Sequence, residues 1–275
     1  MKSYKTMTQS LHTHSLFDDG KAAPEEMVRA AAAAGLKIFG SSLHSPIPDE
    51  VWTCRPERVE AFKQEMQRLE KAYAEQLEVY CGVEYDLLSD KGYLEGFDYV
   101  IASVHGIVAN GATWSMDDTR ERSRRMIVLA FDGDADACAE TYFQRVQTIS
   151  EIPEADIVGH FDLLTKFDEP EQLFNVSSKR YRDAALTAME KLVKAGKIFE
   201  LNTGAVSRGY RTEFYPSNRL LRELHDLGGK LTITSDSHGA DTVDFGYAEA
   251  EQAARDAGFR EIWQFDGKKF VPTEL

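Results

Sequence analysis

The chain has 275 residues, of which 43% are hydrophobic and 28% are charged, a composition typical of an ordinary globular protein with room for one barrel-sized domain. Its 46 acidic and 32 basic residues give a net charge of −14, which argues against a nucleic-acid polymer as ligand because such proteins usually present a basic face. No apolar run approaches the roughly eighteen residues of a membrane span, so an integral membrane protein is excluded.

The cysteines and the N-terminus indicate the compartment. Cys54, Cys81 and Cys138 lie far apart, form no CxxC pair and are odd in number, which argues against a disulfide framework. Residues 1–6 lead into no apolar stretch of the kind that a secretory signal contains. We therefore expect a cytoplasmic protein with reduced thiols, in which Cys81 is buried in a strand.

Short apolar runs alternate with helical patterns along the first hundred residues. Gln9–His14 predicts a first strand, and Pro24 opens a helix with acidic residues in its first turn that closes at Gly35. The same alternation continues with strands at Leu36–Leu43, Leu77–Val83 and Tyr99–Val104 and a long amphipathic helix from Pro56 to about Gln76.

The remainder of the chain begins with a long irregular segment, His105–Asp136, followed by a helix around Ala137–Ser150. We then expect strands at Ile157–Gly159, Ile198–Leu201, Leu231–Thr234 and Ile262–Phe265, and helices near Lys179–Lys194, Ser217–Leu227 and Tyr247–Ala257. Strand–helix alternation favours a parallel sheet with helices outside, and no linker-like stretch divides the chain. One α/β barrel-like domain over residues 1–275 is the simplest interpretation.

Six of the seven histidines stand at or just after the C-terminal end of a predicted strand, where an α/β barrel carries its chemistry. They are His12, His14, His44, His105, His160 and His238. The carboxylates of Glu84 and Asp236 share those places, whereas His225 lies on a predicted helix and is interpreted as a surface residue. Any single histidine is readily explained as a hydrogen-bonded core residue, but six that converge with carboxylates on one face indicate a metal cluster.

Imidazole and carboxylate ligands without thiolate suit zinc, iron or manganese. Eight such ligands are too many for one ion, and Asp19, just before Gly20, adds a ninth, so the set predicts two or three ions. Six neutral histidines, three carboxylates and three divalent ions leave a local charge of about +3. Such a pocket would attract a phosphate dianion despite the acidic chain.

The sequence lacks the other common catalytic and binding motifs. The acidic run Asp132–Asp136 begins like a calcium loop, but Ala137 at its sixth position and Phe143 at its twelfth exclude an EF-hand, and the run is better suited to capping a helix. No GxGxxG follows a strand, and neither a Walker loop nor a GxSxG elbow is present. Nucleotide-fold and serine-nucleophile functions are therefore disfavoured.

The ordered motifs resemble the PHP (polymerase and histidinol phosphatase) superfamily over roughly residues 9–250. These motifs are His12-Thr13-His14-Ser15 with Asp19-Gly20, His44, Gly82-Val83-Glu84, Ser103-Val104-His105, Val158-Gly159-His160 and Ser235-Asp236-Ser237-His238. Several pieces resemble its histidinol-phosphatase branch, notably Leu43-His44-Ser45-Pro46, Gly159-His160-Phe161-Asp162-Leu163, Glu200-Leu201-Asn202-Thr203-Gly204 and Tyr215-Pro216-Ser217.

The resemblance implies a distorted (β/α)7 TIM-like barrel with three metal ions and a metal-bridged hydroxide that attacks the phosphorus of a small phosphate ester. Carried over by position, the first ion would take His12, His14, Glu84 and Asp236, the second Glu84, His105 and His160, and the third Asp19, His44 and His238. Glu84 would thus bridge two ions and take a direct part in catalysis.

A phosphate at such a cluster also needs a cation from the protein. Arg208 is the first choice because its loop follows a strand on the same face, with Arg211 as a reserve and Lys166 near the position where this branch has a basic pair. Asp162, in the branch-like histidine motif, is the candidate acid for the leaving alkoxide.

Asn202, from a branch-like motif, and three aromatic residues complete the expected substrate site. Phe17, Trp52 and Tyr210 lie in loops and could line the pocket, although loop aromatics are as often packing residues. The implied activity is hydrolysis of L-histidinol phosphate.

Three other functions stay open at this point. A nuclease or nucleoside-bisphosphate phosphatase of the same superfamily would use the same ligands. An amidohydrolase is more distant, because that class usually needs a metal-bridging lysine or a single late aspartate. A non-catalytic metal module is disfavoured, since nine ligands on three ions would leave positions open for water.

Overall fold

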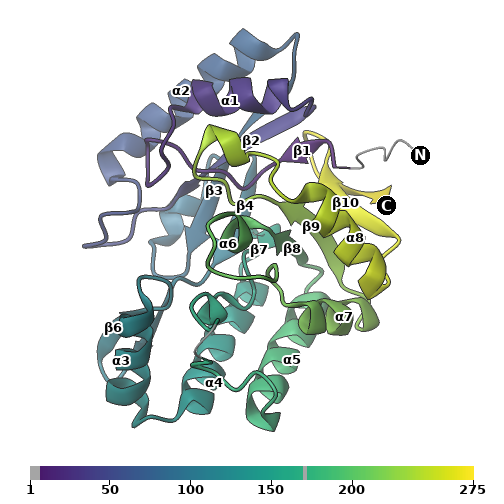
Figure 1. The fold of residues 1–275 in the computed structure, drawn as a ribbon. Helices are drawn as coiled ribbons and strands as arrows, with labels where there is room; N and C mark the ends of the chain where they lie inside the picture. Colours follow the sequence, from purple (N-terminus) through teal and green to yellow (C-terminus); the bar gives the residue numbers. More distant parts are fainter. Residues whose placement is uncertain (1–6, 170–171) are drawn as a thin grey trace.

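The computed structural model describes residues 7–169 and 172–275, so residues 1–6, on which the expectation about a signal sequence partly rests, lie outside the described part. Seven parallel strands form one sheet at the centre of the molecule, with helices packed around them (Figure 1). In sheet order they are β1 (Gln9–Ser10), β2 (Ile38–His44), β3 (Glu78–Asp86), β4 (Tyr99–Ser103), β7 (Ile157–Val158), β8 (Ile198–Asn202) and β9 (Lys230–Thr234). The expected distorted seven-stranded α/β barrel is confirmed.

The barrel closes through short contacts rather than through a full ladder between β1 and β9. At the C-terminal ends of the strands, Thr13 pairs with Ser237, and the His14 amide donates to the Ser237 carbonyl at 2.8 Å. At the opposite end, the hairpin of β10 (Glu261–Phe265) and β11 (Phe270–Glu274) fills the gap, and the Phe265 amide donates to Gln9 Oε1 at 2.8 Å. The segments that carry histidines therefore also form the closing seam of the barrel.

Helices cover the outside of the sheet with the spacing that the sequence predicts. In α2, apolar side chains three and four residues apart face inward and the other positions are mostly charged. The α-helices are α1 (Pro24–Ala33), α2 (Val59–Tyr73), α3 (Arg120–Phe131), α4 (Ala135–Val146), α5 (Lys179–Lys194), α6 (Gly204–Ser207), α7 (Asn218–Asp226) and α8 (Tyr247–Ala257). Short 3-10 turns add η1 (Pro56–Arg58), η2 (Lys91–Leu94), η3 (Gln147–Glu151), η4 (Leu163–Thr165) and η5 (Ala240–Thr242). Across the described ranges, no helix combines the length and apolarity needed to cross a bilayer.

The acidic run at residues 132–136 does cap a helix, as expected. Asp134 is the N-cap of α4, and its side chain accepts a hydrogen bond from the Ala137 amide at 3.0 Å. The three cysteines are free; Cys81 lies in β3 as expected, but it is partly exposed rather than buried.

The segment 105–136 is not irregular, which corrects the sequence-based expectation. It contains the antiparallel hairpin of β5 (Gly106–Ala109) and β6 (Ala112–Ser115), followed by α3. Both hairpin strands have only four residues, too short for a clear alternation of apolar and polar side chains. Asn110 and Gly111 at the turn have φ of 50° and 74°, and this Asn-Gly pair was the available signal for a hairpin.

Inside the barrel, one tyrosine fills the space between two glycines. The Tyr99 ring packs with Leu11, Ile101, Ile157 and Phe265 in a small core, and its hydroxyl donates to the Leu11 carbonyl. Gly40 and Gly82 on the neighbouring strands face this ring, and a Cβ added at either glycine would overlap it. Tyr99 is thus accommodated only because these two strand positions lack side chains.

We expect Gly82→Ala to lower the free energy of unfolding by about 1–3 kcal/mol, because the new methyl group overpacks the barrel core. Urea denaturation of the two proteins measures the difference. Gly92→Ala is the control, since its Cβ would meet only a side-chain oxygen of Asp90 at 3.0 Å, and we expect a change within about 0.5 kcal/mol. Equal stability of Gly82→Ala and wild type would contradict this account of the core.

Candidate metal centre

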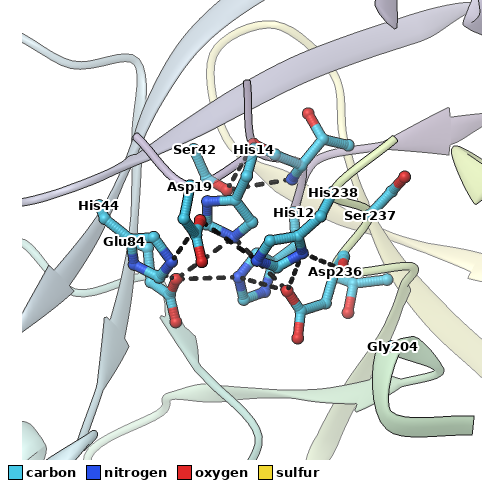
Figure 2. Close-up of polar contacts among 12 residues, drawn as sticks. His12, His14, Asp19, Ser42, His44, Glu84, Gly204, Asp236, Ser237 and His238 are labelled. Atoms are coloured by element: carbon cyan, nitrogen blue, oxygen red, sulfur yellow. Dashed lines mark hydrogen bonds and ion pairs between the residues drawn. The ribbon is translucent and has the colours of Figure 1, made fainter. Parts of the chain in front are cut away.

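The nine residues expected to bind metal converge at the C-terminal ends of the barrel strands, with Glu84 among them. Figure 2 shows seven of them, without His105 and His160. Its Oε2 faces His12 Nε2 at 3.2 Å and His44 Nδ1 at 2.9 Å. Its Oε1 faces His160 Nε2 at 2.9 Å and His105 Nε2 at 3.4 Å. One buried carboxylate from β3 therefore meets imidazoles from both sides.

Two further carboxylates extend the cluster. Asp236 Oδ1 lies 3.5 Å from His14 Nε2 and 3.6 Å from His238 Nδ1. Asp19 Oδ1 lies 3.3 Å from His238 Nε2 and 3.6 Å from His44 Nε2. Three sets have ligand atoms that all lie within 4.8 Å of one another: His14, Asp19, His44 and His238; His12, His14 and Glu84; and His44, Glu84 and His105. These sets overlap the grouping that the family resemblance implies, but His44 lies between Glu84 and Asp19 and contacts both.

Three buried polar atoms at the centre of the cluster lack hydrogen bonds and could bind a cation. Within the described part of the chain, His12 Nε2, His14 Nε2 and Glu84 Oε2 are buried side-chain atoms that form no aligned hydrogen bond, although both nitrogens lie within ion-pair distance of the oxygen. Buried polar atoms are normally hydrogen-bonded, so three that converge without hydrogen bonds indicate a missing group. Imidazole nitrogen and carboxylate oxygen are ligands for borderline divalent cations, and the residues fit such an ion.

The electrostatics of the cluster also favour a cation. Burial alone would lower the pKa of His14, but Asp18, Asp236 and Glu84 outweigh it and raise that pKa to about 10. Burial alone would raise the pKa of Glu84, yet the surrounding histidines hold it well below its ordinary value. The buried carboxylates thus create a negative potential that favours positive charge at the centre, from protons or from metal ions.

Three carboxylates that the sequence analysis missed orient the imidazoles from behind. Asp18 contacts His14 Nδ1 at 3.0 Å, Asp86 contacts His105 Nδ1 at 3.0 Å, and Glu200 contacts His12 Nδ1 at 2.8 Å. Each contact leaves the Nε2 of the same ring facing the centre, as in the carboxylate–histidine–metal arrangement of many metal sites.

Signals for two of these residues were present in the sequence. Asp86 is two residues after the predicted ligand Glu84 on β3, and side chains two residues apart on a strand point to the same face. Asp18 directly precedes the predicted ligand Asp19.

A cavity of about 610 Å³ opens over the cluster, and four of the predicted substrate-site residues line it: Trp52, Lys166, Arg208 and Tyr210. Arg208 lines it and donates to the Asp236 carbonyl oxygen at 2.7 Å and to Asp236 Oδ2 at 3.0 Å. Lys166 lines it and donates to the Asp117 carbonyl oxygen at 3.0 Å, and its Nζ lies 5.0 Å from the centre of the Tyr210 ring. Tyr210 lines the same cavity and is 40% exposed.

Asp162 and Arg211 contact each other, and neither lines this cavity. Both are buried, their charged groups are 3.8 Å apart, and they line a separate cavity of about 230 Å³. Burial raises the pKa of Asp162, whose Oδ2 accepts a hydrogen bond from the Ser217 amide. Because β7 ends at Val158 and the chain then turns into η4, Asp162 lines a different cavity from His160 although it is only two residues away.

Two other predicted residues also lie away from the cavity wall. Phe17 packs against Phe62, with ring centres 5.4 Å apart, and Arg58 covers its face. Asn202 is buried and its Nδ2 donates to Glu200 Oε1 at 2.8 Å and to Asp236 Oδ2 at 3.3 Å. Asn202 therefore holds two carboxylates of the site in position.

Comparison with known proteins finds relatives that match nearly the whole chain. The chain is 27% identical to a probable histidinol-phosphatase of Deinococcus radiodurans over 95% of this chain and 97% of that protein. It is 26% identical to the histidinol-phosphatase of Lactococcus lactis over 94% of both chains.

Among solved structures, the fold is similar to histidinol phosphate phosphatase of Lactococcus lactis in complex with zinc, L-histidinol and phosphate. The TM-score is 0.75, at 21% identity and with 96% of this chain and 98% of that chain covered. The PHP domain family model matches residues 10–204, which is more than half of the chain and includes seven of the nine clustered residues. The protein therefore belongs to the PHP domain family.

Proposed function

We propose that this protein is a metal-dependent phosphomonoesterase that hydrolyses L-histidinol phosphate to L-histidinol and phosphate. The observation that carries the proposal is the cluster of six histidines and three carboxylates, buried except at Asp19 and His238, under a cavity that also contains Arg208 and Lys166. The volume of this cavity, about 610 Å³, suits a small phosphate ester. The relatives that match nearly the whole chain are named histidinol-phosphatases, which supports this ester over others.

We further propose three divalent ions, of zinc, iron or manganese, held by the nine clustered residues with Glu84 as a shared ligand. When bound, such ions supply Lewis acidity at the phosphate and lower the pKa of a water molecule. Zinc in the Lactococcus lactis neighbour supports the choice of a borderline divalent metal. Asp18, Asp86 and Glu200 would keep the three imidazoles in the orientation that metal binding needs.

The chain's own cations would hold the phosphate. A guanidinium has five N–H donors, and the contacts of Arg208 to Asp236 and His238 leave others for a phosphate oxygen. Lys166, whose ammonium group pairs with Asp117, would supply a second positive charge. We do not propose Asp162 as the acid or Arg211 as a phosphate ligand, because both line another cavity.

A phosphate-release screen of the metal-replete protein tests the function. We expect kcat/KM for histidinol phosphate to exceed that for nucleotides and sugar phosphates by at least about tenfold, which needs only ~1.4 kcal/mol of differential transition-state binding. Faster release from adenosine 3′,5′-bisphosphate would instead support a nucleoside-bisphosphate phosphatase.

We expect the zinc-loaded protein to contain two to three equivalents of metal by elemental analysis. We also expect Glu200→Gln to weaken zinc binding by about 10- to 100-fold. The reason is that an amide is a weaker partner for His12 Nδ1–H than a carboxylate is. Competition with a chelator measures the affinity. Glu151→Gln, on the surface, is the control. One equivalent or fewer in wild type, or unchanged affinity in Glu200→Gln, would contradict this description of the site.

We expect Arg208→Ala to lower kcat/KM by about 30- to 1,000-fold, or ~2–4 kcal/mol, because a fork of N–H donors to the phosphate is lost from a partly desolvated site. Arg208→Lys should recover only part of the loss. Arg122→Ala is the matched control, since Arg122 also lines the cavity but is exposed. Metal content is measured in each variant. A loss under threefold in metal-replete Arg208→Ala would exclude Arg208 as a phosphate ligand.

A further inference from the structure

Trp52 forms part of the wall of the metal cavity, on the segment 45–55 between β2 and η1. Its ring lies edge-on to the imidazoles of His44 and His105, with centre-to-centre distances of 4.8 Å and 5.1 Å. Arg208 contacts a different part of the cluster, namely Asp236 and His238. One phosphate ester can therefore meet both residues, with its phosphate at Arg208 and its esterified group at Trp52.

Glu50 holds the indole and brings a negative charge to the same wall. Its Oε2 accepts a hydrogen bond from the indole N–H of Trp52 at 2.8 Å. Asp117 and Asp118 also line the cavity, but each pairs with a lysine or an arginine. Glu50 has no cationic side chain within ion-pair distance among the residues that the structure describes. Its charge is thus available to a ligand.

We propose that Trp52 and Glu50 select the leaving alcohol of the substrate: the indole packs against a flat ring, and the Glu50 carboxylate pairs with a cationic nitrogen. Aromatic faces attract flat rings and cations, and a carboxylate beside such a face adds a charge pair. L-histidinol combines an imidazole ring with an ammonium group. The inference rests on the proposed phosphatase function and identifies the cationic, aromatic alcohol as the feature that this wall recognises.

Four phosphate esters separate the two contributions. Histidinol phosphate has both a ring and a positive charge, 2-phenylethyl phosphate has only the ring, phosphoethanolamine has only the charge, and glycerol phosphate has neither. The kcat/KM of each ester is measured with the metal-replete wild type and with Trp52→Ala and Glu50→Gln. Glutamine keeps an oxygen that can accept the indole N–H, so Glu50→Gln removes mainly the charge.

We expect Trp52→Ala to lower kcat/KM at least tenfold for the two esters that carry a ring and less than threefold for the other two. Glu50→Gln should lower it at least fivefold for the two cationic esters and leave the neutral ones within twofold. Asp49→Asn is the matched control. Asp49 is the residue next to Glu50, but its side chain does not line the metal cavity, so this variant removes the same charge outside the proposed binding wall. The φ of Asp49, 67°, is one that asparagine tolerates.

Binding of the alcohol itself gives a second readout without turnover. L-histidinol should quench tryptophan fluorescence in wild type and bind at least fivefold more weakly to Glu50→Gln, and the quenching should be absent in Trp52→Phe. Equal losses on all four esters would mean that Trp52 only shields the ligand histidines, and no loss on any ester would also overturn the inference. If wild type turns over glycerol phosphate but not histidinol phosphate, the proposed function fails instead.

Discussion

The structure depends on keeping one carboxylate charged at the centre of the barrel mouth. Glu84 is 1% exposed, and a buried, unpaired carboxylate would be protonated or would destabilise the fold. Imidazoles on both of its oxygens favour the charged form, and the Ser103 hydroxyl donates to Oε1 at 2.6 Å. Two of the imidazoles around Glu84, those of His12 and His105, are in turn held by Glu200 and Asp86. The charge of Glu84 is therefore coupled to a second layer of acids that metal ions would neutralise.

The same residues connect the site to the closure of the barrel. The segment that carries His12 and His14 pairs with the segment that carries Asp236 and His238 through the contacts of Thr13 and Ser237. Because β1 and β9 share no ladder, this seam is where metal binding and barrel closure meet. Ligands that bind only the folded state add their binding free energy to its stability, so the loaded protein gains stability at the place where its sheet is weakest.

The parallel barrel and the convergence of the nine candidate ligands were predictable, whereas the orientation of side chains beyond strand ends was not. Side chains two residues apart on a strand point to the same face, and His12 and His14, on either side of the Thr13 bridge, both face Glu84. The same spacing relates Asp86 to Glu84 on β3, but it does not relate Asp162 to His160, because the chain turns into η4 after His160. Arg211 faces Asp162 rather than the phosphate site because its loop returns toward β8, a tertiary contact with no local signal.

The acidic composition and an anionic substrate are compatible because charge acts over a limited range. At physiological ionic strength the Debye length is about 8 Å, so most surface carboxylates contribute little to the potential inside the cavity. The potential there is set by the groups that line it, and Arg208 and Lys166 lie on its wall beside the cluster. A phosphate monoester is small enough to be bound wholly within this local field. A nucleic-acid polymer would instead extend over the surface of a protein with a net charge of −14, so the composition that argues against a polymer is compatible with a monoester.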